Sequence, residues 1–241
     1  MAQSKGGPWL KEIPKVDEIL AEVLNKLGQD FLTSVLSGQT TPSQACQLLE
    51  QQCHKRYIEY EEEVKKKYSK GYDPIRLESS LSQSRVTRAG DTVEKIFKYL
   101  LTLFEIPCER GVRYPRDNGE LLDFVIPNRS QLHSDPTKAV IISVKREVRE
   151  RWREVVGEAY ILREIHKIPD NIWFATITCD VSEYTIRSMV ALRMRVYVPD
   201  ECYSNFKPYG ARPLSSMFED LLSLWKKEKK DRRAQGVYLL K

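Results

Sequence analysis

Leu121-Leu-Asp-Phe-Val-Ile126 is one of two apolar runs that decide the fold of this chain, and Ala139-Val-Ile-Ile-Ser-Val-Lys145 is the other. Runs that are apolar at nearly every position predict strands buried on both faces. A third such strand is expected at 172–178, and shorter strands are expected at 111–114 and 195–199. Helices are expected at about 147–166, 181–192 and 213–228. Strands that alternate with helices indicate an α/β fold, with a mixed central sheet flanked by helices.

The first part of the chain predicts only helices. Apolar residues recur at helical spacing over 16–36, and a second helix, charged and rich in tyrosine, is expected from Pro42 to about Lys70. Gly71 and Pro74 end that helix, and a third is expected over 84–104, entered through Ser84. We therefore expect two parts: residues 1–75 form an N-terminal helical arm or subdomain, and residues 76–241 form the α/β core.

Composition and cysteine spacing narrow the class of protein. The 241 residues are 41% hydrophobic and 30% charged, as in globular proteins, and the net charge of +5 weakly indicates a polyanionic partner. The five cysteines form no CxxC pair and no zinc-type spacing with the three histidines, which predicts reduced cysteines. Without an apolar signal-peptide core or an apolar run of ~20 residues, the chain is expected to be cytoplasmic and to make no membrane contact.

Three charged residues stand where charge is costly. Asp123 lies inside an apolar strand, Lys145 ends the next strand, and Glu158 lies on the inner face of the following helix. Brought together, two carboxylates can hold Mg²⁺ and a lysine can stabilise a phosphate, which suits phosphodiester hydrolysis. Singly, each has a structural explanation: a strand end, an end cap, and an ion-pair partner of Arg153 or Arg163. Their joint spacing favours the catalytic interpretation, with Asp123 and Glu158 as metal ligands.

The order Asp123, Ser143-x-Lys145 and Glu158 resembles the variant PD-(D/E)XK motif of the restriction endonucleases SsoII, PspGI, EcoRII and NgoMIV. The usual motif has an acid two residues before the lysine, where this chain has Ser143. In this subfamily the following helix supplies the displaced acid, which fits Glu158. The resemblance covers residues 80–180 and implies a PD-(D/E)XK nuclease core that uses Mg²⁺. It also implies an additional catalytic role for Glu94.

The residues Arg149-Glu150-Arg151 follow the lysine. On a plain helix they would form a solvated charged face. Arginine can donate two hydrogen bonds to guanine, however, and glutamate can accept from cytosine N4. The resemblance implies that this triplet reads a CC/GG half-site of double-stranded DNA. The implied target is of CCNGG or CCWGG type, cut before the first C.

The resemblance also implies partners and a possible rearrangement of the DNA. A palindromic site cut in both strands predicts a homodimer, with the helices of residues 1–75 at the interface or on the DNA. A cognate DNA methyltransferase is the expected genetic partner, without a stable complex. The central bases could be flipped out of the duplex into a pocket formed by Arg85 with Tyr57 or Tyr60.

Two other functions remain open on the sequence. One is a structure-specific nuclease of the same fold, such as a junction resolvase or a repair nuclease. Such an enzyme recognises DNA shape and needs no glutamate among arginines that face the bases. The other is a DNA-binding protein that has lost catalysis, against which the complete set of two acids and a lysine argues.

Overall fold

The computed structural model describes residues 7–115, 118–148, 151–169 and 171–234. By its internal contacts the chain forms two compact units, Met1–Phe97 and Lys98–Lys241. This boundary falls inside a helix, whereas the sequence placed it between residues 75 and 76. The roles expected for the two parts remain predictions. No helix in the described part of the chain is long and apolar enough to cross a membrane.

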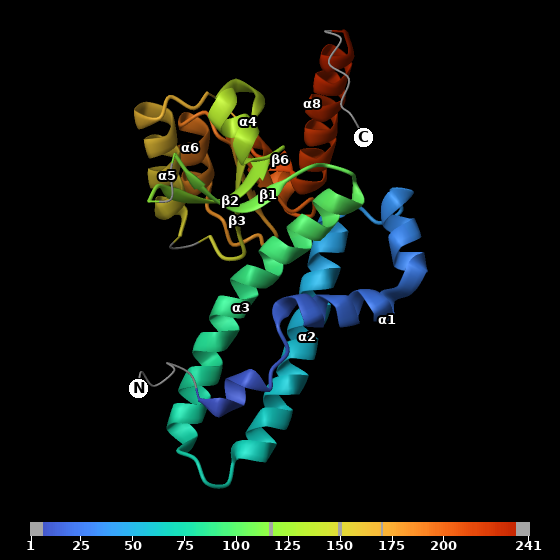
Figure 1. Ribbon diagram of the computed structural model, residues 1–241, viewed down its shortest axis with the longest axis vertical. Coiled ribbons are helices and arrows are strands. Elements are labelled where there is room, and N and C mark those ends of the chain that lie inside the picture. The colour runs from blue at the N-terminus through green and yellow to red at the C-terminus, as the bar shows by residue number, and fades with distance from the viewer. Residues whose placement is uncertain (1–6, 116–117, 149–150, 170, 235–241) are drawn as a thin grey trace. The chain divides into compact units, whose positions relative to one another are not determined.

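The first unit is helical, as predicted. It contains η1 (Pro8–Lys11), α1 (Val16–Leu36), α2 (Pro42–Tyr68) and most of α3 (Pro74–Leu103). Thr41 caps α2 by accepting a hydrogen bond from the Gln44 amide, and Gly28 bends α1 with a φ of 70°. Figure 1 shows α2 and α3 as an antiparallel pair joined by a tight turn.

One helix boundary in this unit was predicted wrongly. The sequence placed the start of the third helix at Ser84, but α3 begins at Pro74. Gly90, part of the expected entry to that helix, lies inside α3, where a Cβ at this position would meet no other atom. Leu77 and Leu81 are buried, which explains why the helix forms from its first turns.

The N-terminal segment is attached to this helical pair. The Trp9 side chain is 2% exposed, and its Nε1 donates to Ser80 Oγ of α3 at 2.7 Å. Its ring meets the rings of Tyr68 and Tyr72 edge to face, at 6.0 and 5.3 Å between centroids. The Arg88 guanidinium also donates to the backbone carbonyl groups of Ile13 and Pro14.

The second unit contains a six-stranded sheet in the order β1-β2-β3-β4-β5-β6. The strands are β1 (Glu109–Tyr114), β2 (Glu120–Ile126), β3 (Val140–Lys145), β4 (Ile172–Thr176), β5 (Arg195–Val198) and β6 (Arg212–Pro213). β1–β2 and β2–β3 pair antiparallel, and the remaining neighbours pair parallel, so the predicted mixed sheet is confirmed. The two-residue strand β6 was not predicted, because so short a segment carries no periodicity.

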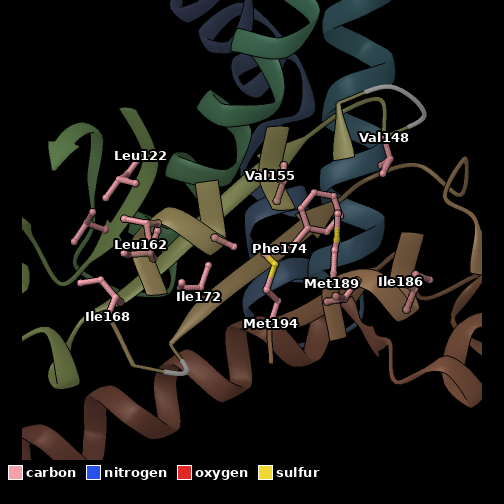
Figure 2. Close-up of a cluster of buried hydrophobic side chains, with 14 of the residues drawn as sticks. Leu122, Val148, Val155, Leu162, Ile168, Ile172, Phe174, Ile186, Met189 and Met194 are labelled. Atoms are coloured by element: carbon pink, nitrogen blue, oxygen red, sulfur yellow. The ribbon is translucent and has the colours of Figure 1, made fainter. Parts of the chain in front are cut away.

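Helices cover both faces of this sheet. α5 (Trp152–Tyr160) and α6 (Glu183–Ala191) lie side by side on one face (Figure 1), where Val155, Met189 and Phe174 meet in the core shown in Figure 2. α8 (Leu214–Ala234) covers the other face: its Asp220 accepts from Tyr197 Oη of β5 at 2.7 Å and from Arg212 of β6 at 2.9 Å.

Short helical segments complete the second unit. They are α4 (Arg129–Ser134), η2 (Pro136–Lys138), η3 (Ile161–Ile165), α7 (Tyr203–Phe206) and η4 (Lys207–Tyr209). The helix expected from residue 147 begins only at Trp152, so that expectation was wrong. The Val148 side chain is 1% exposed and belongs to the core, so the residues directly after Lys145 serve core packing rather than a helix.

The expectation of reduced cysteines was wrong for Cys179 and Cys202, which form a disulfide. The two residues are 23 positions apart, a spacing that carries no recognisable signal. They follow the parallel neighbours β4 and β5, whose carboxyl ends meet at one edge of the sheet. Their Cα atoms are therefore only 6.0 Å apart.

Removing this disulfide should destabilise the protein by about 3 kcal/mol, because the closed loop no longer restricts the unfolded chain. Thermal unfolding should show a lower Tm for wild-type protein in the presence of a reductant, and for Cys179→Ser without it. Adding the reductant to Cys179→Ser is the control and should cause no further change. Equal Tm values for reduced and unreduced wild-type protein would contradict the prediction.

Candidate active site

The register of β2 on β3 brings the predicted acid and lysine together. Phe124 pairs with Ile142, so the next position along places Asp123 beside Ser143. Oδ2 of Asp123 accepts hydrogen bonds from Lys145 Nζ at 2.7 Å, from the Val144 amide at 2.8 Å and from Ser143 Oγ at 3.2 Å. Thus Ser143, which replaces the acid of the usual motif, orients the remaining acid.

The contact between Asp123 and Lys145 is a sheltered ion pair. Their side chains are 13% and 12% exposed. An isolated charge in such surroundings would be strongly destabilising, so removal of either partner should cost more than the pair itself contributes. Lys145 has two further donor positions on its ammonium group, which are available to other acceptors.

Glu158 lies on α5, and its side chain is half-buried. Burial, and after it the negative charge of Asp123, raises the pKa of its carboxyl to about 7. The Lys145 ammonium acts in the opposite direction, while Glu120 and Glu154 make smaller contributions that raise the pKa. The structure therefore brings Glu158 within electrostatic reach of both Asp123 and Lys145.

Two of these carboxyl groups fit a magnesium site. Within the described ranges, His, Cys, Asp and Glu side chains form no group of three or more that could hold a metal ion. Mg²⁺ commonly takes only one or two protein carboxylates and completes its shell with water and substrate phosphate. A carboxyl that retains its proton because a second carboxylate lies nearby can exchange that proton for a cation. Glu158, whose pKa is raised by burial and by the Asp123 carboxylate, meets this description, and Asp123 supplies the second carboxylate.

Glu120 is a functional candidate that the sequence interpretation missed. It begins β2, three residues before Asp123, and its charge acts on Glu158. An acid at the entrance of an apolar strand looks like an ordinary strand boundary. Only the position of α5 against the sheet shows that this acid adds to the negative charge around Glu158.

The other predicted site residues are placed less completely. Glu94 lies half-buried on α3 in the first unit, and its catalytic role remains a prediction. Arg149 and Glu150 lie outside the described residues. Arg151 directly precedes α5 and forms an exposed ion pair with Glu154 at 3.2 Å. Exposed pairs of this kind contribute little stability, so the Arg151 guanidinium can readily change partner.

Of the three residues expected to form a base-flipping pocket, two line the same cavity. Tyr57 and Arg85 line a small pocket between α1, α2 and α3. Arg85 also forms an ion pair of 2.7 Å with Glu61, whose side chain is 2% exposed. Tyr60 is outside this pocket: its hydroxyl donates to Glu22 at 2.8 Å, and the Arg56 guanidinium lies over its ring. A base-flipping role for any of them remains a prediction.

Comparison with known proteins gives consistent matches. The model of the EcoRII C-terminal family matches residues 53–221. The chain is 32% identical over 154 residues to the type II restriction enzyme SsoII of Shigella sonnei, a match that covers 61% of this chain and 48% of SsoII. The chain thus spans about half the length of this curated relative.

Solved structures are similar over most of the chain. The restriction endonuclease PspGI in complex with substrate DNA is 32% identical, with a TM-score of 0.82 over 92% of this chain and 96% of that one. Metal-depleted Ecl18kI in complex with uncleaved, modified DNA is 22% identical, with a TM-score of 0.76 over 90% of this chain and 80% of that one. The second match shows likeness of fold.

Glu158→Gln should stabilise the metal-free protein at alkaline pH. Because the pKa of Glu158 is raised, the unfolded chain releases this proton near pH 4.5 and the folded chain only near pH 7. Folding stability therefore falls with rising pH across this window, and the full cost remains above it. Glutamine avoids that cost, so the variant should be more stable by roughly 1–3 kcal/mol at about pH 8.

The measurement is thermal or urea unfolding in EDTA at several pH values. The difference between variant and wild type should shrink as the pH falls towards 4.5. Glu154→Gln, on the exposed side of the same helix, is the matched control and should show no comparable pH dependence. A constant difference at all pH values would mean that Glu158 keeps an ordinary pKa.

Proposed function

The chain belongs to the EcoRII C-terminal family of type II restriction endonucleases, and we propose that it cuts both strands of DNA at a short palindromic site as a Mg²⁺-dependent hydrolase. The observation that carries this proposal is the sheltered pair of Asp123 and Lys145 with Glu158 beside it. These are the groups that phosphodiester hydrolysis requires. Fold similarity alone would not support an activity, because one fold hosts many functions.

In the proposed reaction, a water oxygen forms a bond to phosphorus while the bond from phosphorus to the leaving sugar oxygen breaks. Asp123 and Glu158 would hold the Mg²⁺ ion, which when bound would supply charge that stabilises the transition state and lowers the pKa of the attacking water. Lys145 keeps its charge and its hydrogen bond to Asp123, and its other two N–H groups can donate hydrogen bonds to the water and to a phosphate oxygen. We assign Glu94 an additional role at the site, on the motif resemblance.

We propose that Arg149, Glu150 and Arg151 read the bases of a CC/GG half-site. The expected target is CCNGG or CCWGG, cut before the first C. Arg151 supports this role because its guanidinium is exposed and only weakly paired. We further propose that the central bases are flipped towards the pocket lined by Tyr57 and Arg85, with Tyr60 close by on the same helix.

The proposed enzyme acts as a homodimer on double-stranded DNA. One chain supplies one set of Asp123, Lys145 and Glu158, whereas a double-strand cut needs two equivalent sets facing opposite strands. The helices of residues 1–75 are our candidates for the dimer interface or additional DNA contacts. A cytoplasmic location and a cognate methyltransferase as genetic partner remain predictions.

Loss of any one of the three groups should abolish cleavage but not binding. Asp123→Asn, Lys145→Ala and Glu158→Gln should each lower the cleavage rate by at least about a hundredfold, because they serve phosphate and metal rather than bases. The assay is cleavage of plasmid DNA in Mg²⁺, in EDTA and in Ca²⁺, with binding measured in Ca²⁺. Asp135→Asn, at the N-cap of η2 before β3, is the control and should cut normally. Wild-type rates for Lys145→Ala would refute the catalytic assignment.

Glu150→Ala gives the sharpest test of base reading. If Glu150 accepts hydrogen bonds from cytosine, its loss leaves those donors unpaired and weakens specific binding by about 1–3 kcal/mol. Non-specific binding should tighten, because a negative charge near phosphate is removed. Glu147→Ala, the same change on a nearby exposed residue, is the control and should preserve selectivity. Competition between cognate and scrambled duplexes separates these outcomes, and unchanged selectivity of Glu150→Ala would exclude base reading by this residue.

A further inference from the structure

We propose that Glu61 of α2 is a positioning residue for Arg85, whose guanidinium it holds as one wall of the pocket that Arg85 and Tyr57 line. The inference rests on the proposed function of that pocket, which is to receive a base flipped out of the duplex. It assigns Glu61 a role that acts through Arg85, without contact to the base. All three residues belong to the first unit of the chain.

Two hydrogen bonds join Arg85 to a single oxygen of Glu61. Nε and Nη2 of Arg85 donate to Oε2 of Glu61 at 3.1 and 2.7 Å. Both donors lie on the same edge of the planar guanidinium, so the pair fixes the orientation of its plane as well as its position. The two bonds do not use Nη1 or the broad face of the guanidinium, which is the surface that stacks on aromatic rings.

The burial of Glu61 is not explained by stability. Its side chain is 2% exposed, and its Oε1 has no hydrogen-bond partner among the residues that the structure describes. A buried carboxylate oxygen without a donor costs free energy, and apolar side chains in place of a buried ion pair are often neutral or stabilising. The Arg85 side chain is 35% exposed, so its charge could be hydrated without Glu61. The pair is therefore better explained by its effect on Arg85.

Glu61 lies one helical turn after Tyr57, so both side chains lie on the face of α2 that meets α3. Oη of Tyr57 donates to Ser84 Oγ of α3 at 3.3 Å, and the Arg88 guanidinium lies 5.5 Å from the centroid of the Tyr57 ring. Tyr57, Arg85 and Arg88 all line the pocket. Its wall thus contains an aromatic ring and two guanidinium groups.

The two arginines of this wall are held differently. Arg88 donates to Ser84 Oγ at 3.2 Å and to two backbone carbonyl groups of the N-terminal segment. These bonds restrain Arg88 without any contribution from Glu61. Arg85 is the arginine whose orientation depends on the buried carboxylate.

A fixed guanidinium favours binding of an extruded base. Extrusion breaks the stacking of that base in the duplex, and contact with an aromatic ring or a guanidinium plane offsets this cost. A side chain that is free to rotate loses conformational entropy when the base arrives, whereas one that is already fixed loses less. Loss of the Glu61 carboxylate should therefore weaken only the binding that depends on the flipped base.

The test compares DNA binding with and without the central bases. One duplex carries the proposed CCWGG site, and the other is identical except that the central base is missing from both strands, so that no base can enter the pocket. Dissociation constants are measured in Ca²⁺ for wild-type protein, Arg85→Ala, Glu61→Met and the double variant. Glu61→Met removes both carboxylate oxygens and keeps the length of the side chain. Glu78→Met removes an exposed carboxylate paired with Lys65 at 2.7 Å, and this matched control should bind both duplexes as wild-type protein does.

Glu61→Met should weaken binding to the intact duplex by about fivefold and leave binding to the duplex without central bases unchanged. Arg85→Ala should show at least the same loss on the intact duplex. Adding Glu61→Met to Arg85→Ala should cause no further loss, because Glu61 acts through Arg85.

Equal losses on both duplexes would show that Glu61 supports the fold in general, which would overturn the proposal. The proposal also fails if Glu61→Met loses nothing where Arg85→Ala does, or if it weakens Arg85→Ala as much as wild-type protein. If Glu61→Met does not fold, as judged by its melting curve, Glu61→Gln is measured with the same criteria. If Arg85→Ala binds both duplexes as tightly as wild-type protein, the base-flipping part of the proposed function is wrong, and the role of Glu61 falls with it.

Discussion

Oδ2 of Asp123 accepts hydrogen bonds from the Lys145 ammonium and the Val144 amide, and the arrangement of the second unit depends on this contact between β2 and β3. A carboxylate among apolar strand residues persists only because these donors neutralise and solvate it. A slip of one residue in the pairing would turn Asp123 to the other face and leave Lys145 without its partner. The contact that prepares the chemistry therefore also specifies the register of the central strands.

The candidate site is built at a cost in stability. Burial raises the pKa of Glu158 most, and the charges of Asp123, Glu120 and Glu154 act in the same direction. Such crowding of carboxyl groups has no structural benefit in a metal-free protein. Crowded carboxyl groups are expected where a divalent cation binds and neutralises them beside a phosphate. Such a site lowers the folding stability of the metal-free protein but favours binding of the cation.

Much of this arrangement could be predicted from the sequence, because its causes are local. The apolar runs gave β2, β3 and β4, and the spacing of Asp123, Lys145 and Glu158 pointed to a family that the match over residues 53–221 confirms. What failed depends on tertiary contacts. Burial of Val148 delays α5 to Trp152, and the meeting of Cys179 with Cys202 follows from parallel strand ends. Glu120 was missed for the same reason, since Glu158, on which its charge acts, lies on another element.

The attachment of α8 to the sheet has a consequence for how the sequence can vary. Asp220 accepts from Tyr197 and Arg212 and lies 3.6 Å from Arg195, so one carboxylate serves three partners on two strands. The Tyr197 ring is fully buried, and without Asp220 its hydroxyl would lose this acceptor in the interior. A substitution that removes the carboxylate of Asp220 leaves all three partners without this acceptor. These four positions should therefore change together among related chains, or not at all.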